Sequence, residues 1–441
     1  MRSRPPSTAP WRLPRRTVRP STSAAPPTPQ ASWPPSPGAR SRRPDACRVP
    51  LDPPAPVATV APMTRIAFYA PLKPPSHPIP SGDREIARNL MKALALAGFD
   101  PFVASEAIAY QKRPSAELFA DRRARCEAEV DRLLAVWQAQ PAAKPDLWMT
   151  YHPYCKAPDW IGPPVCRALA IPYVTVEACR TRQDTDADWA DGRAVVQAAV
   201  RQAAVNFCLK PADRAYLESF LPDASSIVAL KPFIDLADLP DAVDVEGPCA
   251  AGEGPLILSV GMMRPGAKID SYRLLAEALA GLVDRPWRLV IIGDGPGRNE
   301  VEAMFGFAGD RARFTGAVPH EQVLGWMKKA DLFAWPGMRE AFGVAYLEAQ
   351  AIGLPVAAFA TAGVPVVVGH DESGLLAPEF DIVAYRDNLA RLLASPQERA
   401  RLGAGGRAKV ARDHGLDAAA ATLEGALLPL VGARTGVAVA P

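Results

Sequence analysis

A short apolar run that leads through a tight turn into a short helix is the feature that most constrains the fold of this chain. Residues 331–335 (DLFAW) have the composition of a buried strand, and Pro336-Gly337 ends it. A helix is predicted over 344–352, and Gly353 and Pro355 stop that helix. Short apolar runs alternate with amphipathic helical stretches along the rest of the chain, so we expect an α/β fold.

Two glutamates flank the start of this helix. The unpaired N–H groups of Phe342, Gly343 and Val344 should point out of the helix N-terminus, where the helix dipole favours an anion such as a diphosphate. Glu340 precedes the helix and Glu348 lies inside it, so both can face one crevice. Carboxylates accept hydrogen bonds from paired hydroxyls, and we infer one glutamate for a sugar ring and one for a ribose. The alternative is a pair of solvated glutamates.

The sequence around this helix resembles a known family. Residues 340–356 (EAFGVAYLEAQAIGLPV) are similar to the signature of glycosyltransferase family 4, the retaining group 1 transferases with a GT-B fold. Further similarity lies at 256–261, 289–296, 314–316, 330–332, 363–365 and 371–376. Together these matches cover most of residues 255–395. The resemblance implies two Rossmann-like, doubly wound domains that face a central cleft.

The 441 residues suffice for two such domains with flanking segments. The expected divisions are a disordered extension at 1–62, an acceptor-side Rossmann-like domain at 63–235, a linker at 236–254, a donor-binding domain at 255–425 and a tail at 426–441.

The first 62 residues differ in composition from the rest. They hold ten Arg, two Asp and no Lys or Glu, a formal charge of +8, and since the whole chain carries +3, the remainder carries −5. The segment is rich in Pro and Ser and has no apolar period, so we expect disorder. A strand pattern follows Met63, and we expect the folded chain to begin there; whether 1–62 is translated stays open.

The resemblance implies an enzyme of the hexosyltransferase type (EC 2.4), with polysaccharide biosynthesis as its setting. A sugar would pass from a nucleotide-sugar donor to a glycan, lipid-linked or small-molecule acceptor, with the leaving phosphate taking the acceptor's proton and no catalytic base from the protein. Two alternatives stay open, a sugar-nucleotide epimerase of the same architecture and a non-catalytic protein that binds nucleotide sugars or glycans. Donor base and sugar, acceptor, linkage and oligomeric state are not determined by the sequence.

Two basic residues follow the first strand of the donor domain. After Gly261 the family carries an Arg and a Lys that hold the diphosphate, and this chain has Arg264 and Lys268 in a loop one residue longer. A guanidinium and an ammonium suit a pyrophosphate, although they could also form a solvated surface pair. We therefore expect Glu340, Arg264 and Lys268 to be catalytic, and Gly261, Phe342, Gly343, Val344 and Glu348 to bind the donor.

The same two cations supply the charge that a metal ion would otherwise bring. We expect no metal and no cofactor apart from the nucleotide-sugar co-substrate. The acidic run 184–188 (DTDAD) follows a strand of the N-terminal domain, and we interpret it as a surface turn. Gly293-Asp294-Gly295-Pro296-Gly297 has Arg298 where a dinucleotide fingerprint needs its third glycine, so an NAD-binding function is set aside.

Cleft residues of the N-terminal domain are predicted at the ends of its strands and in its first loop. Ser81 and Gly82 precede a helix predicted over 84–97, for which Asp83 is an N-cap candidate. His152 follows the strand 146–151, at the end where open α/β sheets bind ligands; the alternative is a turn histidine satisfied by backbone.

Glu177 stands where the family has a histidine near the donor sugar. Its carboxylate could hydrogen-bond a sugar hydroxyl or repel the diphosphate, and His152 is the candidate to take the place of the missing histidine.

Several classes of protein are disfavoured by the sequence. The basicity belongs to the extension, so no nucleic-acid partner is expected. Seven cysteines without a Cys-x-x-Cys pair indicate reduced thiols in a cytoplasmic protein. No apolar run reaches eighteen residues, which argues against a membrane span and leaves peripheral membrane contact open.

Overall fold

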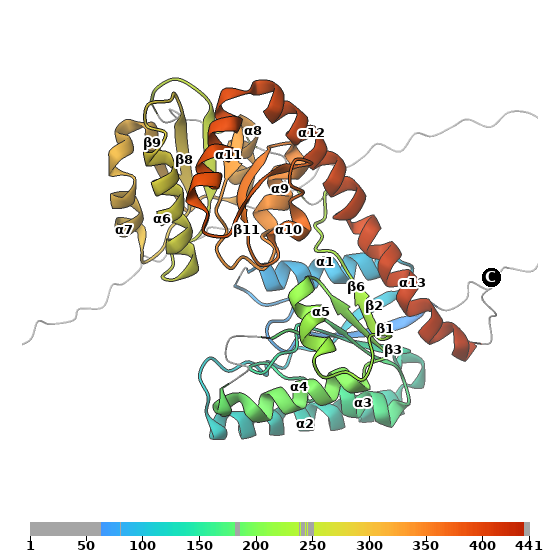
Figure 1. The fold of residues 1–441 in the computed structure, drawn as a ribbon. Helices are drawn as coiled ribbons and strands as arrows, with labels where there is room; N and C mark the ends of the chain where they lie inside the picture. The colour runs from blue at the N-terminus through green and yellow to red at the C-terminus, as the bar shows by residue number, and fades with distance from the viewer. Residues whose placement is uncertain are drawn as a thin grey trace, which may run out of the picture. The chain divides into compact units, whose positions relative to one another are not determined.

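Two parallel six-stranded sheets, each with helices on its faces, form the structure of this chain (Figure 1). The computed structural model describes residues 63–79, 81–180, 186–237, 239, 243, 245 and 251–435. The extension at 1–62 and most of 238–250 lie outside the described residues. The prediction of disorder for that extension therefore concerns residues that the structure does not describe. The predicted α/β class with two Rossmann-like domains is confirmed.

The first sheet has the strand order β2-β1-β3-β4-β5-β6. Its strands are β1 (Arg65–Tyr69), β2 (Asp100–Ser105), β3 (Leu147–Tyr151), β4 (Tyr173–Val176), β5 (Val205–Cys208) and β6 (Ile227–Ala229). The helices are α1 (Gly82–Leu96), α2 (Ala116–Ala139), α3 (Gly162–Leu169), α4 (Ala190–Gln202) and α5 (Pro211–Glu218), with short 3-10 turns η1 (Pro141–Ala143) and η3 (Ala187–Trp189).

The second sheet has the order β12-β11-β10-β7-β8-β9. Its strands are β7 (Leu256–Val260), β8 (Arg288–Ile292), β9 (Ala312–Gly316), β10 (Leu332–Ala334), β11 (Val356–Ala360) and β12 (Gly374–Pro378). The helices are α6 (Ala267–Ala280), α7 (Arg298–Met304), α8 (His320–Lys329), α9 (Val344–Ile352), α10 (Val364–Val367), α11 (Ile382–Ala394), α12 (Pro396–Asp413) and α13 (Leu416–Thr435), with the 3-10 turn η4 (Gly306–Arg311). The helix predicted over 344–352 therefore has the observed bounds of α9.

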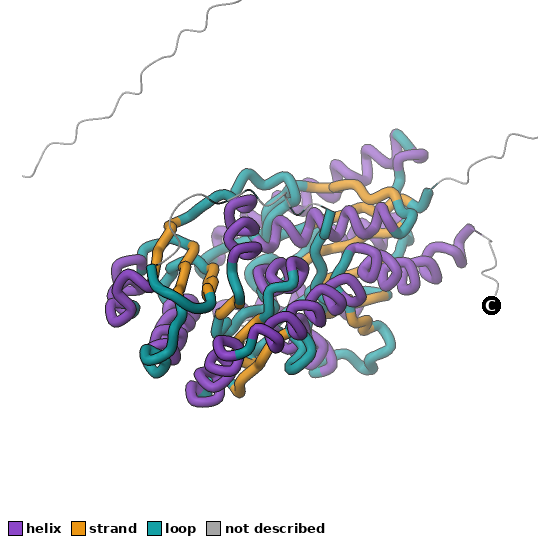
Figure 2. Tube along the Cα trace, turned by 90° about the horizontal axis from the view of Figure 1, so that it is seen from above, coloured by secondary structure: helices purple, strands orange, loops and turns teal. Residues whose placement is uncertain are grey.

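Alternation along β1 shows how helices cover both faces of the first sheet. Ile66 and Phe68 point to one face and belong to a core with residues of α1, whereas Ala67 and Tyr69 point to the other face and pack with residues of α2 and α3. All four side chains are fully buried. Burial on both faces is typical of parallel sheets, and the strands lie between two layers of helix (Figure 2).

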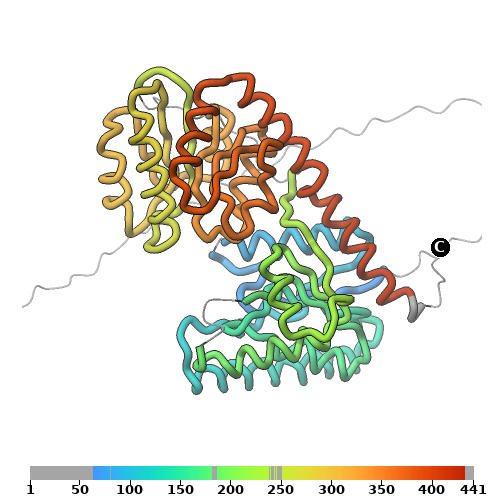
Figure 3. The backbone as a smooth tube through the Cα atoms, viewed as in Figure 1, coloured from blue at the N-terminus to red at the C-terminus, as the bar shows by residue number. Residues whose placement is uncertain are grey.

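The last helix of the described chain, α13, packs along the first helix, α1 (Figures 1 and 3). Leu423, Leu427 and Val431 of α13 are buried. The helix extends through Thr435, into the range assigned from the sequence to a tail. By length and composition, Pro396–Gly432 is the one helical stretch of the described chain that could cross a membrane. This is weak evidence, because the core helix of a soluble protein passes the same test.

A buried carboxylate fixes the loop between β3 and α3. Asp159 is 1% exposed, and its Oδ1 accepts hydrogen bonds from the backbone N–H groups of Ile161 and Gly162, both at 2.8 Å. Its Oδ2 accepts from the hydroxyls of Thr150 at 2.5 Å and Tyr173 at 2.8 Å. The carboxylate thereby joins two strands to the start of α3, and burial raises its pKa although these hydrogen bonds oppose the rise.

We predict that Asp159→Ala lowers the free energy of unfolding by about 2–4 kcal/mol, because it leaves two backbone N–H groups at the start of α3 and two buried hydroxyls without their acceptor. Urea denaturation measures the change. Asp159→Asn keeps the size and one acceptor oxygen and should cost less than half as much. Equal losses in the two variants would contradict the hydrogen-bonding role.

The difference in stability between the wild type and Asp159→Asn should depend on pH. Because the pKa of Asp159 is raised above its ordinary 3.8, the folded state holds a proton in a pH range where the unfolded state has lost it. Wild-type stability relative to Asp159→Asn should therefore rise as the pH falls through the folded pKa towards 3.8.

Candidate functional site

A cavity of about 350 Å³ lies where strand ends of the two sheets meet. The first domain contributes Gly82, Asp83, Ile86, His152 and Glu177, and the second contributes Val260, Lys268, Phe333, Trp335 and residues 340–346. Eight residues predicted for the site from the sequence line this one cavity: Gly82, His152, Glu177, Lys268, Glu340, Phe342, Gly343 and Val344.

The start of α9 forms one wall of the cavity. Its N-cap is Gly343, and no side chain caps the helix. Within the described residues, no acceptor is found for the N–H groups of Phe342, Gly343 and Val344. Gly343 has φ +75°, and a Cβ there would lie 2.6 Å from Cδ2 of Tyr346, so glycine is required. These donors and the helix dipole make an anion-binding wall.

Lys268 and Glu340 form an ion pair across this wall. The Nζ of Lys268 lies 2.5 Å from Oε2 of Glu340, and it also lies 5.3 Å from the ring centre of Trp335. Both charged side chains are partly exposed, at 27% and 21%. The ammonium is thus held beside the helix start, where a bound diphosphate would compete with Glu340 for it.

Glu348 occupies the next turn of α9 and does not line the cavity. Its Oε1 lies 2.9 Å from Nε2 of His320, the first residue of α8. The hydrogen bond that His320 donates to Glu348 raises the pKa of the imidazole, although burial opposes this rise. A ribose that binds Glu348 would therefore have to displace or share the imidazole.

Three further predicted residues, besides Glu348, lie outside the cavity lining. Arg264 is exposed in the loop after β7. Gly261 accepts a 2.6 Å hydrogen bond from the hydroxyl of Tyr272 through its carbonyl, and a Cβ there would meet the ring of Trp335 at 3.0 Å. Ser81 is the N-cap of α1, because its hydroxyl accepts from the N–H of Arg84. The N-cap role considered for Asp83 was therefore wrong, and α1 begins two residues earlier than predicted.

Asp83 is instead paired with His152. Its Oδ1 lies 3.0 Å from Nδ1 of the imidazole. Burial opposes ionisation of Asp83, yet the hydrogen bond and the charge of His152 lower its pKa. His152 and Glu177 both have positive φ, +57° and +56°, immediately after β3 and β4. Such conformations cost energy in residues other than glycine and are concentrated at functional sites.

Glu177 is held from behind by a buried ammonium. Lys210, which follows β5, lies 3.1 Å from Oε1 of Glu177 and 2.9 Å from Oδ1 of Asp213, and the hydroxyl of Tyr151 donates to Oε2 of Glu177 at 3.2 Å. Burial opposes the charge on Lys210, but the two carboxylates raise its pKa. Burial raises the pKa of Asp213 to about 6.

Sequence reasoning missed Lys210, His320 and Trp335 as members of the site. Each lies at the end of a strand or at the start of a helix, and this position is the sequence feature that could have identified it. Their partners, however, are 28 to 67 residues away in the chain. No group of three metal-ligating side chains occurs in the part of the chain that the structure describes. The acidic run 184–188 lies partly outside that part.

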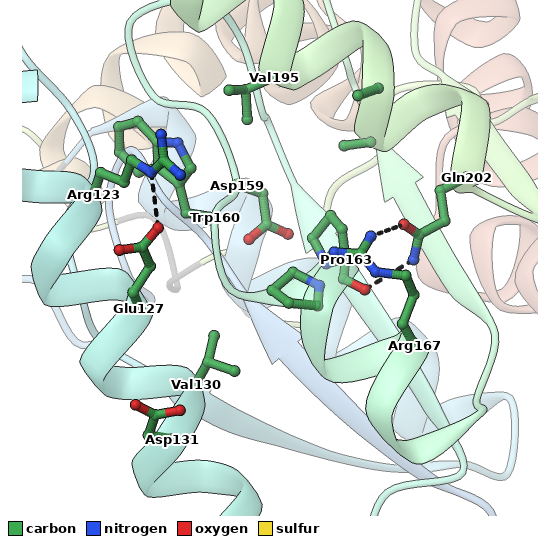
Figure 4. Close-up of a pocket in the computed structure, with 13 residues that line it drawn as sticks. Arg123, Glu127, Val130, Asp131, Asp159, Trp160, Pro163, Arg167, Val195 and Gln202 are labelled. Atoms are coloured by element: carbon green, nitrogen blue, oxygen red, sulfur yellow. Dashed lines mark hydrogen bonds and ion pairs between the residues drawn. The ribbon is translucent and has the colours of Figure 1, made fainter. Parts of the chain in front are cut away.

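A second cavity, of about 510 Å³, is larger. It lies among α2, α3 and α4, with Val130, Trp160, Pro163 and Val195 as apolar lining (Figure 4). The two arginines at its edge are hydrogen-bonded within the protein, Arg123 to Glu127 and Arg167 to Gln202. By volume alone this cavity would be preferred to the one at the strand ends. The open helix start and convergent charges select the smaller one at the strand ends.

Comparisons with known proteins show what this chain resembles. Residues 249–409 match the model of the family described as "Glycosyl transferases group 1". The chain is 37% identical over 177 residues to the D-inositol 3-phosphate glycosyltransferase of Xylanimonas cellulosilytica, covering 39% of this chain and 41% of that protein. It is 30% identical over 261 residues to the 2-deoxystreptamine glucosyltransferase of Streptomyces kanamyceticus, covering 53% and 65%. These matches thus span about half of each relative's length.

Among solved structures, sucrose-phosphate synthase from Thermosynechococcus elongatus superposes with a TM-score of 0.62 at 21% identity, over 84% of this chain and all of that one. This likeness extends the shared architecture over both sheets. Residues 249–409 are thus similar to the glycosyl transferases of group 1, and the architecture of two parallel domains is shared with a solved structure of the GT-B fold.

Proposed function

We propose that this protein transfers a sugar from a nucleotide-sugar donor to an acceptor, with retention of the anomeric configuration. The observation that supports this most directly is the cavity itself. It brings the unpaired amides of α9, Lys268 and Glu340 of the family-matched domain together with His152 and Glu177 of the other domain. A donor bound on the first set would present its sugar to an acceptor bound near the second.

Departure of the nucleoside diphosphate is the step that this wall can assist. Negative charge grows on the leaving phosphate as the glycosidic bond breaks, and the fixed N–H groups of residues 342–344 with the ammonium of Lys268 stabilise that charge without rearrangement. The leaving phosphate takes the proton of the acceptor hydroxyl on the same face of the sugar. We therefore assign no protein side chain as the base.

The Lys268–Glu340 pair links donor binding to sugar recognition. A diphosphate attracts Lys268 more strongly than one carboxylate does, because it offers more oxygens and charge. Glu340 then loses its partner and is free to accept hydrogen bonds from sugar hydroxyls. We include metal independence in this proposal, since the fixed amides and the ammonium together meet the charge of the diphosphate.

The proposal extends to the chemical class of the acceptor and to the cellular compartment. The relatives named above are glycosyltransferases for D-inositol 3-phosphate and 2-deoxystreptamine, and a small polyhydroxylated acceptor is accordingly the class to test first. Cys126, Cys166, Cys179 and Cys208 are free and buried, as are thiols in proteins of a reducing compartment. We propose a cytoplasmic location, with peripheral membrane contact left to experiment.

We predict that one nucleoside diphosphate among UDP, GDP and ADP stabilises the full chain in a thermal-shift assay, with and without EDTA. At one hundred times its Kd the ligand should add about 2.7 kcal/mol. Lys268→Ala should reduce the shift for that nucleotide, because the diphosphate loses an ammonium. A shift abolished by EDTA would contradict metal independence, and no shift with any nucleotide or its sugar conjugates would overturn the proposed function.

We predict that the two glutamates separate kinetically. Glu348→Gln should weaken nucleotide binding about tenfold, because a charged acceptor for the ribose is lost. Glu340→Gln should lower kcat about a hundredfold and leave the Kd of the nucleotide within about twofold. Release of nucleoside diphosphate in the presence of acceptor gives kcat, and calorimetry gives Kd.

The exposed Glu277 of α6 provides the control, since Glu277→Gln should change neither constant. Turnover of donor without acceptor would favour the epimerase alternative. Unchanged kcat in Glu340→Gln would contradict the assignment of that residue.

A further inference from the structure

A cysteine, a histidine and an aspartate lie in line beside the cavity. Cys179 follows β4, and its Sγ lies 3.4 Å from Nε2 of His152. On the other side of the ring, Nδ1 lies 3.0 Å from Oδ1 of Asp83 in the first turn of α1. None of the transfer steps above uses the thiol. The three side chains come from three separate elements, so the fold and not local sequence brings them together.

This arrangement has the geometry of an activated nucleophile. A thiol lies within reach of a base, and the base is oriented by a third group. Asp83 accepts a hydrogen bond from Nδ1 and so leaves Nε2 to take the thiol proton. Burial works against a charged imidazole, but Glu177, Cys179 and Asp83 together raise the pKa of His152 well above 6.5. The imidazole is thus able to hold a proton taken from the sulfur.

Other ionisable groups around His152 do not take over its role. Tyr151 and Tyr154 adjoin it in sequence, and Tyr154 stacks on the imidazole with ring centres 5.2 Å apart. Burial raises the pKa of both phenols, so they stay protonated. Lys210 pairs with both Asp213 and Glu177. The charges that face the imidazole directly are therefore those of Asp83, Glu177 and Cys179.

Cys126, Cys166 and Cys208 have no imidazole partner of this kind. Burial raises the pKa of Cys126 and Cys208 to about 12 and raises that of Cys166 as well. Cys208 is the closest match to Cys179. It ends the neighbouring strand β5, is 5% exposed against 6% for Cys179, and also lies near Lys210, but it has no imidazole partner. The chain therefore contains its own control thiol.

We propose that Cys179 is a nucleophilic thiol activated by His152, and a site of covalent modification by soft electrophiles next to His152, which lines the cavity. With iodoacetamide, the thiol proton moves to Nε2 of His152 as the sulfur electron pair forms a bond to the methylene carbon. The carbon–iodine bond breaks and iodide leaves. An adduct at Cys179 displaces the imidazole of His152, which lines the cavity, and so links modification of the thiol to occupancy of the site.

The test is a time course of iodoacetamide labelling of the full chain at pH 7. The quenched protein is denatured, its remaining thiols are labelled with heavy iodoacetamide, and the ratio is measured for each cysteine peptide by mass spectrometry. An ordinary thiol is only a few per cent thiolate at this pH. We therefore expect Cys179 to react at least about tenfold faster than Cys208. Equal rates would overturn the proposal, whatever the outcome for sugar transfer.

Variants of the two partners identify the cause. His152→Gln should slow the labelling of Cys179 about tenfold and leave the labelling rate of Cys208 unchanged. Asp83→Asn should slow the labelling of Cys179 by a smaller factor. His370→Gln, on the second domain, should have no effect. A general rise in the labelling of Cys126 would reveal unfolding of the His152 variant, in which case Asp83→Asn decides. An unchanged Cys179 rate in a folded variant of either partner would show that the thiol is not activated by His152.

Discussion

Parallel pairing of every strand is the constraint on which the rest of this structure depends. In each sheet all strands run in the same direction, so their carboxyl ends meet along one edge. His152, Glu177 and Lys210 follow three adjacent strands of the first sheet, and Lys268 and Glu340 follow β7 and β10 of the second. Each of these residues is separated from the next in the sequence by at least one strand–helix unit. Their side chains nevertheless form a small number of connected pairs.

The charged side chains at this edge are paired with one another when no ligand is bound. Lys268 is paired with Glu340, Asp83 with His152, and Glu177 with Lys210. Leaving any of these charges buried and unpaired would be costly, and the pairs keep the empty site stable. A dianionic ligand at the start of α9 can take Lys268 without leaving Glu340 buried alone, because Glu340 is 21% exposed and sugar hydroxyls or water can solvate it.

Sequence reasoning was most successful where local chemistry decides the structure. The turn at Pro336-Gly337 and the stop at Gly353 fix α9, and the resemblance of 340–356 led to Glu340 and the helix start. Pairings between elements were not predictable, because they depend on strand register and helix rotation. Arg264 and Lys268 are four residues apart, yet only Lys268 reaches the cavity. Asp83 was considered as a cap, but the first turn of α1 directs its carboxylate to His152.

The carboxylate of Glu177 illustrates why neighbouring residues, and not residue type alone, determine what a charge can do. Two roles were open for it from the sequence, a hydrogen bond to a sugar or repulsion of a diphosphate. Glu177 is 4% exposed, with Lys210 and the Tyr151 hydroxyl on its two oxygens. Its charge is therefore largely balanced within the first domain, and repulsion of a distant phosphate is correspondingly weak. Its field acts instead on His152, whose protonated form it favours. An imidazole that has taken the thiol proton carries a positive charge close to Glu177, and it does so from the strand adjacent to the one at whose end the family has its histidine.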